Sequence, residues 1–404
     1  MKVTIRPSRA RGTVAAPPSK SMAHRLLISA ALCAGESVVR GISESEDMGA
    51  TLDCLSALGA TCICEGNTVR VKGFDPRLSS PTVPLLPRES GSTLRFMIPI
   101  AMLSGNEVTL RGAPSLMQRP MGIYENLCRE KNMIFRQEGC EITVKGALSA
   151  GEYRVAGNVS SQFISGLLFA LPLTSGESRI RITPPVESRS YIELTRAALR
   201  EFGVAVEWED DCTLYVAGDQ RYHAHDATVE GDYSNAAFLD AFSLFGGDVQ
   251  VTGLREDSLQ GDRVYRQHFQ ALSQGDATIH IGDCPDLGPI LFALAAAKHG
   301  ATFTGTRRLR IKESDRVRTM EQELKKFGTD MEIGEDTVRV IPTAFHAPRE
   351  PLDGHNDHRI VMSMAVLASM TGGEINDAEA VGKSFPDFFD RIRKLGVSVK
   401  TSKH

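Results

Sequence analysis

A unit of about 70 residues recurs six times along this chain of 404 residues, and the recurrence constrains the fold more than any other feature. Each copy contains an apolar run typical of a buried helix, followed by a glycine that is expected to stop it. These glycines are Gly35, Gly105, Gly176, Gly247, Gly300 and Gly373. Open solenoids have shorter periods, typically of about 20 to 50 residues. Closed α/β lobes are therefore predicted.

After each stop, the pattern predicts a short strand, an amphipathic helix and, in most copies, a β-hairpin. The amphipathic helices end at glycine in five copies and at Asn132 in the second copy, and Asn also tolerates a left-handed C-cap. The last copy is one strand short, and the alternating segment Lys2–Arg6 is the expected donor of that strand. With three copies per lobe, we predict an N-terminal lobe over 19–228 and a C-terminal lobe over 1–18 plus 229–404.

Composition excludes several classes of protein. Hydrophobic residues make up 42% of the chain and charged residues 24%, which favours a folded globular protein. The formal net charge is -4, so no nucleic-acid or membrane partner is expected. Apolar runs such as Ile290–Ala297 are shorter than the roughly 18 to 20 residues of a membrane span, and no signal peptide is evident, so we expect a cytoplasmic protein. The spacing of Cys62 and Cys64 matches no zinc module, so no metal is expected.

Polar segments stand directly before the six apolar helices. Their Ser, Asn and Asp residues are ordinary N-caps, which is the simplest interpretation of each segment alone. Four cations, however, lie in or beside first helical turns, where the helix dipole disfavours positive charge by about 0.3 to 1 kcal/mol each. They are Lys20, Arg25, Arg95 and Arg359. A bound phosphate or carboxylate would reverse that cost, so the pattern indicates an anion site.

Further cationic segments occur after the strands of other copies, at Arg119-Pro120, Arg310–Arg316 and Gly382–Ser384. For Lys312 and Arg316 the alternative interpretation is a solvated helix face with an i,i+4 pair. The residues around Gly382–Ser384 lack the first glycine of a Walker A motif, so hydrolysis of a nucleoside triphosphate is not expected. Near Asp357, capping with one functional arginine is favoured over a metal site.

Seven segments, in this order across nearly the whole chain, resemble the 5-enolpyruvylshikimate-3-phosphate (EPSP) synthase family. They are Ser19-Lys20-Ser21 with Arg25, Glu89–Arg95, Arg119-Pro120-Met121, Ser160-Ser161-Gln162, Lys312–Arg316, Asp357-His358-Arg359 and Lys383–Asp387. The resemblance implies an α/β (α+β) fold of two lobes, each an inside-out α/β barrel of three βαβαββ copies. It also implies a hinge between the lobes and an active site in the cleft.

The implied reaction transfers the enolpyruvyl group of phosphoenolpyruvate to the 5-hydroxyl of shikimate 3-phosphate and releases phosphate, in chorismate and aromatic amino-acid biosynthesis. No cofactor is implied. By resemblance, shikimate 3-phosphate would contact Lys20, Ser21, Arg25, Ser160, Ser161, Gln162, Ser188, Tyr191, Asp286 and Lys312. Phosphoenolpyruvate would contact Lys20, Gly91, Arg119, Gln162, Arg316, Arg359 and Lys383.

The same resemblance suggests catalytic roles for two carboxylates and a lysine. We expect Asp286 to take the hydroxyl proton, Glu313 to protonate the methylene carbon, and Lys20 to stabilise charge. The chain departs from the family at Arg308, where the family often has an Asn that binds shikimate 3-phosphate. Gly91 and Phe96 bear on inhibition by glyphosate, a candidate inhibitor.

Two alternative functions fit the sequence less well. UDP-N-acetylglucosamine enolpyruvyl transferase shares the chemistry, but it pairs the N-terminal lysine with Asn and uses a loop cysteine. Here Ser21 follows Lys20, and the loop Ala113–Gly122 has no cysteine. A non-catalytic repeat scaffold would be expected to lose motif charges, yet all of them are present. We therefore expect an enzyme, acting as a monomer on two small-molecule substrates.

Overall fold

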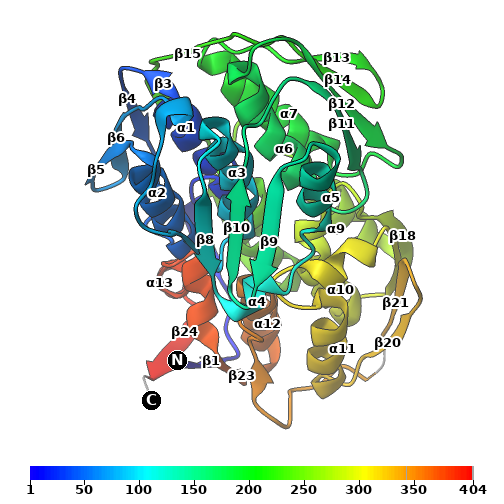
Figure 1. Ribbon diagram of the computed structural model, residues 1–404. Helices are drawn as coiled ribbons and strands as arrows, with labels where there is room; N and C mark the ends of the chain where they lie inside the picture. The colour runs from blue at the N-terminus through cyan, green and yellow to red at the C-terminus, as the bar shows by residue number, and fades with distance from the viewer. Residues whose placement is uncertain (343, 403–404) are drawn as a thin grey trace. The chain divides into compact units, whose positions relative to one another are not determined.

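The computed structural model describes residues 1–342 and 344–402 (Figure 1). The chain forms two compact units. The N-terminal unit is Lys20–Val229, and the C-terminal unit combines Met1–Ser19 with Glu230–His404. Each unit has its own hydrophobic core.

The N-terminal unit contains three four-stranded sheets with one topology, in which a parallel pair is extended by an antiparallel hairpin. In spatial order, the first sheet is β16 (Ala227–Thr228), β4 (Glu36–Arg40), β6 (Thr68–Lys72) and β5 (Thr61–Glu65). The second is β7 (Leu85–Arg88), β8 (Val108–Gly112), β10 (Glu141–Lys145) and β9 (Ile134–Glu138). The third is β11 (Gly151–Ala156), β12 (Ser178–Thr183), β14 (Thr213–Val216) and β13 (Glu207–Asp210). A short parallel pair joins β3 (Cys33–Ala34) to β15 (Tyr222–His223).

The apolar runs of this unit form its buried helices, namely α1 (Lys20–Ala31), α3 (Gly91–Ala101) and α6 (Ser161–Ala170). The amphipathic helices are α2 (Glu46–Leu58), α5 (Gly122–Glu130) and α7 (Arg189–Glu201), and a short α4 spans Pro114–Met117. Short 3₁₀ segments are η1 (Pro76–Leu78), η2 (Met102–Ser104) and η3 (Leu171–Leu173). Asn132, two residues after α5, has φ 55°, so the left-handed conformation predicted there is confirmed.

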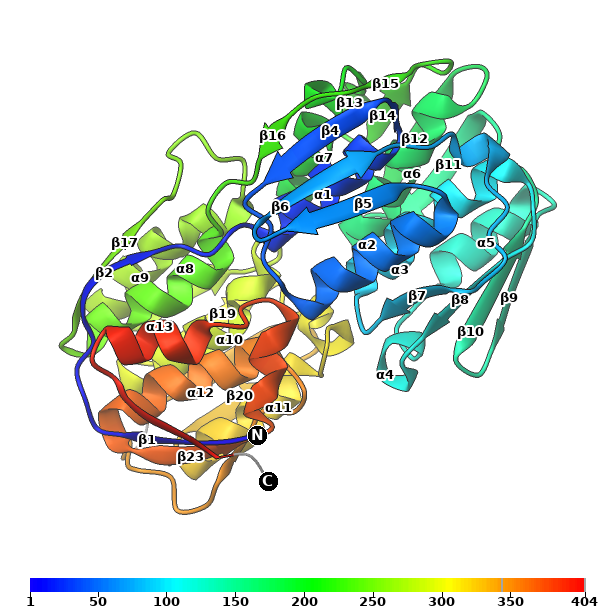
Figure 2. The same ribbon diagram turned by 90° about the vertical axis from the view of Figure 1, so that its left-hand side faces the viewer.

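The C-terminal unit repeats the same four-stranded topology twice (Figure 2). One sheet is β18 (Ala277–His280), β19 (Ala301–Thr304), β21 (Thr337–Ile341) and β20 (Asp330–Ile333). The other is β22 (Leu352–Asp353), β23 (Gly373–Asn376), β1 (Lys2–Arg6) and β24 (Ser398–Ser402). The remaining copy is reduced to the parallel pair β17 (Asp248–Thr252) and β2 (Arg11–Ala15).

Strand β1 completes the sheet of the last copy, as predicted. It pairs antiparallel with both β23 and β24, so that Val3 lies opposite Ile375 on one side and Thr401 on the other. Val3 and Ile5 are buried, which fixes the register because a slip of one residue would expose both side chains. The two ends of the chain therefore meet in one sheet.

The helices of the C-terminal unit also divide into buried apolar helices and outer amphipathic helices. The buried ones are α8 (Tyr233–Asp240), α10 (Gly288–Ala297) and α12 (His358–Thr371). The outer ones are α9 (Tyr265–Gln274), α11 (Arg316–Lys326) and α13 (Phe388–Lys394). The 3₁₀ segments are η4 (Ala241–Phe245), η5 (Gly261–Val264), η6 (Pro285–Leu287), η7 (Arg307–Ile311) and η8 (Ala378–Lys383).

Two of the glycines predicted to end the apolar helices, Gly247 and Gly373, are preceded by the glycine that takes this role. Gly246 and Gly372 have φ 80° and 82°, whereas Gly373 is already the first residue of β23. The first glycine of each pair takes the left-handed position, and the second enters the next segment. The mixed α/β class and the recurring unit predicted from the sequence are otherwise confirmed.

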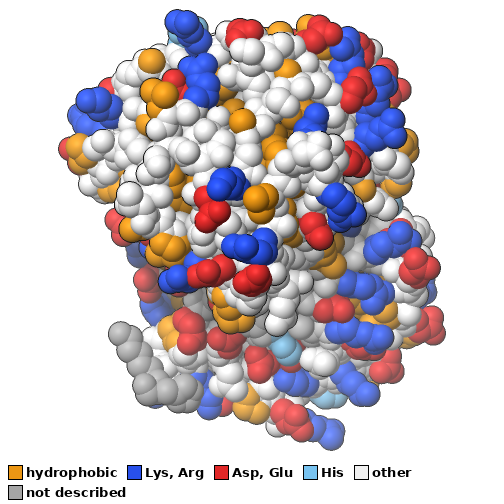
Figure 3. Space-filling view, in the orientation of Figure 1, with side chains coloured by type: hydrophobic (Ala, Val, Ile, Leu, Met, Phe, Trp, Pro, Cys, Tyr) orange, Lys and Arg blue, Asp and Glu red, His pale blue; other side chains and the backbone are white. Residues whose placement is uncertain are grey.

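Within the described residues, none of the helices has both the length and the apolar character needed to cross a bilayer. On the face in view in Figure 3, basic and acidic side chains are interspersed. Arg111 of β8 and Glu141 of β10 form a cross-strand ion pair at 2.7 Å.

Candidate functional site

The predicted site residues fall into two polar clusters, one in each unit. In the N-terminal unit, Lys20 is the first residue of α1, and its Nζ lies 2.7 Å from Oδ2 of Asp47 in the first turn of α2. Both side chains are largely buried, at 14% and 12% exposed. Asp47 sits where a helix dipole favours negative charge, so it is a stable anchor for the ammonium group.

Arg25, one turn further along α1, is 3% exposed. Its Nε donates to Thr195 Oγ1 at 2.8 Å, and its guanidinium also donates to the backbone oxygens of Ser21 and Tyr191 at 2.6 and 3.1 Å. Burial lowers the pKa of Arg25 to about 10. Because these three partners are uncharged, the positive charge of Arg25 can serve an anionic ligand.

Arg95 joins three segments of the N-terminal cluster. Its guanidinium donates to Gln162 Oε1 at 2.6 Å and to the Pro120 carbonyl at 3.3 Å, and Gln162 in turn donates to Ser92 Oγ at 2.8 Å. The starts of α3 and α6 and the Arg119-Pro120 loop therefore meet. The caps predicted here are present, since Ser90 and Ser160 accept hydrogen bonds from the backbone N–H groups of Thr93 and Gln162.

Gly91 lies against the arginines of this cluster. A Cβ built on it would be 2.8 Å from Nη1 of Arg119 and 3.5 Å from Nη1 of Arg95. The absence of a side chain thus lets the Arg119 guanidinium lie over the first turn of α3. Gly91, Arg119 and Gln162, predicted to act together, are neighbours in the structure.

Ser188 and Tyr191 stand at the start of α7. Ser188 is fully buried and has φ 55°, an uncommon conformation for a residue other than glycine. The ring of Tyr191 lies 5.9 Å from the Arg25 guanidinium, measured to the ring centroid. Such strained backbone clusters at functional sites. Ser161 begins α6 and Ser21 lies beside Lys20, so these serines share the cluster of helix starts.

The cluster in the C-terminal unit is centred on Asp286 in η6. Oδ1 of this carboxylate accepts from Arg316 Nη1 at 3.0 Å and lies 3.4 Å from Lys312 Nζ, while Oδ2 accepts from Arg359 Nη2 at 3.0 Å. The Asp286 side chain is 19% exposed. Three cations thus stabilise its ionised form.

Arg316 is the hub of this cluster and is 1% exposed. Besides Asp286, it donates to Glu313 Oε2 at 2.7 Å and, through Nε, to Asp357 Oδ2 at 2.8 Å. Burial lowers the pKa of Arg316, but the carboxylates of Asp357, Glu313 and Asp286 outweigh burial and raise the pKa above its ordinary value. The interpretation of Lys312 and Arg316 as a solvated pair on one helix face is therefore wrong.

The other cations of this cluster are also held by short contacts. Lys383, at the end of η8, donates to the Asn356 carbonyl at 2.6 Å, and Arg359 donates to Ser234 Oγ at 2.7 Å. Burial lowers the pKa of Lys312, and Asp286 partly offsets that effect. Asp357 caps α12 as predicted, by accepting from the Arg359 N–H at 3.0 Å.

The two clusters place buried Lys and Arg side chains, hydroxyls and helix N-termini together, a set of groups that binds phosphates and carboxylates. Among the described residues, no group of three or more His, Cys, Asp and Glu is arranged to hold a metal ion. A sequence model of EPSP synthase (3-phosphoshikimate 1-carboxyvinyltransferase) matches residues 5–392. The chain belongs to the EPSP synthase family.

Individual members of the family are similar over almost the entire chain. A 3-phosphoshikimate 1-carboxyvinyltransferase from Clostridium kluyveri is 38% identical and covers 98% of this chain and 97% of its own. One from Clostridioides difficile is 34% identical, with 97% of both chains covered. The structure of EPSP synthase from Acinetobacter baumannii matches with a TM-score of 0.80 over 100% of both chains at 23% identity, which shows the shared fold. The family predicted from the seven motifs is confirmed.

The residue at which the resemblance implied a departure from the family is buried. Arg308, in η7, is 4% exposed and donates to the Gly282 carbonyl at 3.4 Å. Its charge lies close enough to Lys312 to lower the pKa of that lysine further, after burial has done so. Arg308 therefore adds positive charge to the C-terminal cluster.

Sequence analysis missed three partners of the predicted residues. Asp47 holds Lys20, Asp357 holds Arg316, and Thr195 holds Arg25. These contacts join segments that are 27, 41 and 170 residues apart, so no local pattern reveals them. Arg95 was recognised as an unusual cation at a helix start, and that signal could have placed it in the site.

Proposed function

We propose that this chain transfers the enolpyruvyl group of phosphoenolpyruvate to the 5-hydroxyl of shikimate 3-phosphate and releases phosphate, as part of chorismate and aromatic amino-acid biosynthesis. The observation that carries the proposal is family membership over residues 5–392 with every motif cation and carboxylate in place. Both substrates carry a phosphate and a carboxylate. The concentration of buried cations in a chain with a net charge of -4 supports such ligands.

The N-terminal cluster contains most of the residues assigned to shikimate 3-phosphate. They are Lys20, Ser21, Arg25, Ser160, Ser161, Gln162, Ser188 and Tyr191, with Asp286 and Lys312 from the C-terminal cluster. Arg25 supports the assignment because it is buried against uncharged oxygens. The hydroxyls of Ser160 and Ser161 stand at a helix N-terminus, which suits an anionic group.

Phosphoenolpyruvate is assigned to Lys20, Gly91, Arg119, Gln162, Arg316, Arg359 and Lys383. Planar guanidinium groups bind carboxylates and phosphates through paired hydrogen bonds. Arg316 and Arg359 each donate one hydrogen bond to the carboxylate of Asp286, one to each oxygen. A substrate anion competes for the same donors and thereby loosens their hold on Asp286.

The proposed chemistry balances over two steps. In the first, Glu313 gives a proton to the methylene carbon of the enol, the 5-hydroxyl oxygen bonds to the adjacent carbon, and Asp286 takes the hydroxyl proton. In the second, the bond from that carbon to the phosphate oxygen breaks, Glu313 takes a proton back from the methyl group as the double bond re-forms, and the proton held by Asp286 leaves with the phosphate. Lys20 stabilises the developing negative charge.

The surroundings of the two carboxylates support these different roles. Asp286 contacts three cations, which keep it ionised, and it becomes a better proton acceptor when a substrate anion draws those cations away. Glu313 contacts Arg316 at 2.7 Å, and this contact favours the ionised carboxylate. A proton donor must be protonated, so a change at the site has to weaken the contact. An anion bound to Arg316 weakens that pair and brings negative charge beside Glu313, which favours the protonated carboxyl.

Phosphate release tests the proposal directly. With both substrates present, the protein should release phosphate continuously, and with either substrate alone it should release none. Asp286→Asn should abolish most of the turnover. Asp283 is a neighbouring exposed carboxylate, and Asp283→Asn should leave the turnover largely unchanged. Absence of phosphate release by the folded wild-type protein would contradict the proposed function.

Three further properties belong to the same proposal. We expect a cytoplasmic monomer, which native mass spectrometry and fractionation would check. Glyphosate carries a carboxylate and a phosphonate, so it should compete with phosphoenolpyruvate for the same cations. Gly91 lies close to Arg119, which supports an influence of this glycine on the binding of both glyphosate and phosphoenolpyruvate.

A further inference from the structure

One buried carboxylate of the C-terminal unit has no part in the proposed mechanism. Glu323 lies on α11, two turns after Arg316, and its side chain is 1% exposed. It accepts hydrogen bonds from Lys326 Nζ at 2.9 and 3.0 Å, from His355 Nε2 at 2.9 Å and from the backbone N–H of Asp353 at 2.9 Å. Burial of a charge requires such partners, and two of the three belong to one loop.

That loop, Asp353–Asp357, leads from β22 into α12 and has an unusual backbone. His355 and Asn356 are consecutive, and their φ angles are 49° and 51°. Residues other than glycine pay a steric penalty in this left-handed region and persist there only where surrounding contacts hold them. Two carboxylates hold the backbone of these residues. Asp353 Oδ1 accepts a hydrogen bond from the His355 N–H at 2.7 Å, and Asp377 accepts one from the Asn356 N–H. Glu323 binds the same loop from the side of α11.

The strained loop presents two groups to the cations of the C-terminal cluster. The Asn356 carbonyl accepts from Lys383 Nζ at 2.6 Å, and the Asp357 carboxylate accepts from Arg316 Nε at 2.8 Å. Helix α11 thus contacts the loop at two points. Arg316, at the start of the helix, binds Asp357, and Glu323, two turns later in the helix, binds His355. Lys383 and Arg316 are both assigned to phosphoenolpyruvate.

We propose that Glu323 is a positioning residue for phosphoenolpyruvate, because it holds the Asp353–Asp357 loop in the strained form that places Lys383 and Arg316. This inference rests on the proposed function. Glu323 itself touches neither substrate. Its effect passes through His355 and the Asp353 N–H to the Asn356 carbonyl and the Asp357 carboxylate.

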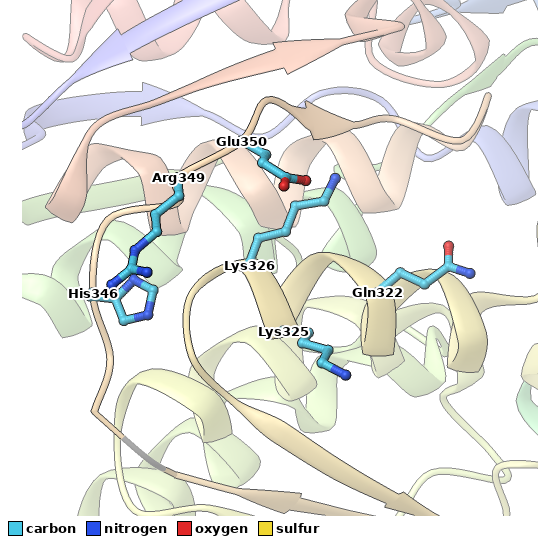
Figure 4. A pocket seen from close by; sticks show the side chains of 6 residues that line it. All are labelled: Gln322, Lys325, Lys326, His346, Arg349 and Glu350. Atoms are coloured by element: carbon cyan, nitrogen blue, oxygen red, sulfur yellow. The ribbon is translucent and has the colours of Figure 1, made fainter.

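Among the partners of Glu323, Lys326 lies on the same helix as Glu323, and it is 22% exposed, about as much as His355 at 23%. A cavity of about 540 Å³ adjoins α11 and is lined by Gln322, Lys325, Lys326, His346, Arg349 and Glu350 (Figure 4). Because Lys326 and Glu323 belong to the same helix, the ion pair between them does not tie Glu323 to the Asp353–Asp357 loop. The contacts to His355 and Asp353 therefore carry the positioning effect.

The charged groups that face His355 are Glu323 and Lys326 on α11 and Asp353 at the end of β22. The hydrogen bond to Glu323 raises the pKa of His355 above its ordinary value, against the opposing effect of burial. A raised pKa means that the ion pair is complete at low pH and is lost as the pH rises through the folded-state pKa. The KM for phosphoenolpyruvate should therefore rise on the alkaline side.

The first test compares Glu323→Gln with wild type in steady-state kinetics. The substitution should raise the KM for phosphoenolpyruvate by about 5-fold or more and leave the KM for shikimate 3-phosphate within about 2-fold. Lys325→Gln, on the neighbouring exposed lysine, is the matched control and should change neither constant. Adding Asn356→Gly to Glu323→Gln should recover at least half of the lost affinity, because glycine adopts the left-handed conformation without strain and keeps the carbonyl that binds Lys383.

The second test approaches the loop from its exposed side, where folding is less at risk. His355→Ala should raise the KM for phosphoenolpyruvate by about 3-fold at pH 7 and remove its alkaline rise. A wild-type enzyme that is inactive with both substrates would overturn the proposed function. An active enzyme in which folded Glu323→Gln or, should that variant not fold, His355→Ala keeps the wild-type KM would overturn only the positioning role.

Discussion

The Nε atom of Arg316 donates to Oδ2 of Asp357 at 2.8 Å, and the two side chains are 1% and 0% exposed. Asp357 also caps α12 through the N–H of Arg359. One carboxylate thus orders both an arginine at the start of α11 and the first turn of α12. Because it is buried, it is expected to matter for stability as well as for the site.

Removing this carboxylate should destabilise the C-terminal unit. Asp357→Ala leaves Arg316 with less negative charge around it in a buried position, and breaking a buried pair in this way costs about 3 to 5 kcal/mol. Asp357→Asn keeps an oxygen for the cap and should cost less. Urea unfolding followed by fluorescence and circular dichroism would measure both. Equal stability of Asp357→Ala and wild type would show that the pair contributes nothing.

The same pair predicts the response of stability to acid. Burial alone would raise the pKa of Asp357, but Arg316 outweighs it and the pKa lies below its ordinary value. A carboxyl with a lowered folded-state pKa contributes stability above its unfolded pKa of about 3.9, and that contribution is lost as the pH falls further. The melting temperature should therefore drop below about pH 4 more steeply in wild type than in Asp357→Asn. If the melting temperatures of wild type and Asp357→Asn fell equally with pH, the predicted contribution of Asp357 would be contradicted.

His24 predicts a second pH effect, in the N-terminal unit. Burial lowers the pKa of His24 well below its ordinary value, and the charges of Lys20 and Arg25 lower it further. The folded state therefore prefers neutral His24, so stability should be full above about pH 6.5 and should fall below it. His24→Asn, which retains a polar partner for Thr51, should flatten the decrease between about pH 6.5 and 5 in calorimetric melting. A wild-type melting temperature that is constant over this range would exclude the effect.

Gly91→Ala tests the approach of Arg119 to α3. The new methyl group would lie 2.8 Å from Arg119 Nη1, so the guanidinium must move. We expect the KM for phosphoenolpyruvate to rise by about 10-fold with weaker inhibition by glyphosate, while the KM for shikimate 3-phosphate changes little. Gly122→Ala is the control, since a Cβ there meets nothing within 4 Å. Unchanged kinetics in Gly91→Ala would remove Arg119 from the anion site.

Asp286→Asn should separate catalysis from binding. It removes the proposed base and should lower kcat by about 10² to 10⁴-fold. Phosphoenolpyruvate should bind at least as well, because Arg316 and Arg359 lose the carboxylate that now competes for them. Isothermal titration with each substrate would measure binding, and phosphate release would measure kcat. A variant with wild-type kcat would exclude Asp286 as the base.

The sequence was sufficient to predict the repeating elements because their signals are local. An apolar run with a polar cap and a following glycine identified α1, α3, α6, α8, α10 and α12. The alternation in Lys2–Arg6, together with a last copy that lacked a strand, was enough to predict the position of β1. These features depend on neighbours in sequence or on a simple count of strands, so they survive without knowledge of packing.

The partners of the site residues could not be predicted in the same way. Asp315 caps α11 through the N–H groups of Val317 and Arg318, so the helix begins at Arg316 and Lys312 lies outside it. The i,i+4 interpretation failed for this reason. The left-handed conformation of His355 and Asn356 could not be predicted either, because neither is glycine and Glu323, which binds His355, lies more than 30 residues earlier.

The identity of the product tests the central claim most directly. Incubation of the wild-type protein with phosphoenolpyruvate and shikimate 3-phosphate should give one phosphate per molecule of a new ether, with the enolpyruvyl group attached at the 5-oxygen in nuclear magnetic resonance spectra. Phosphate without the ether, or an enolpyruvyl group on another hydroxyl, would contradict the account.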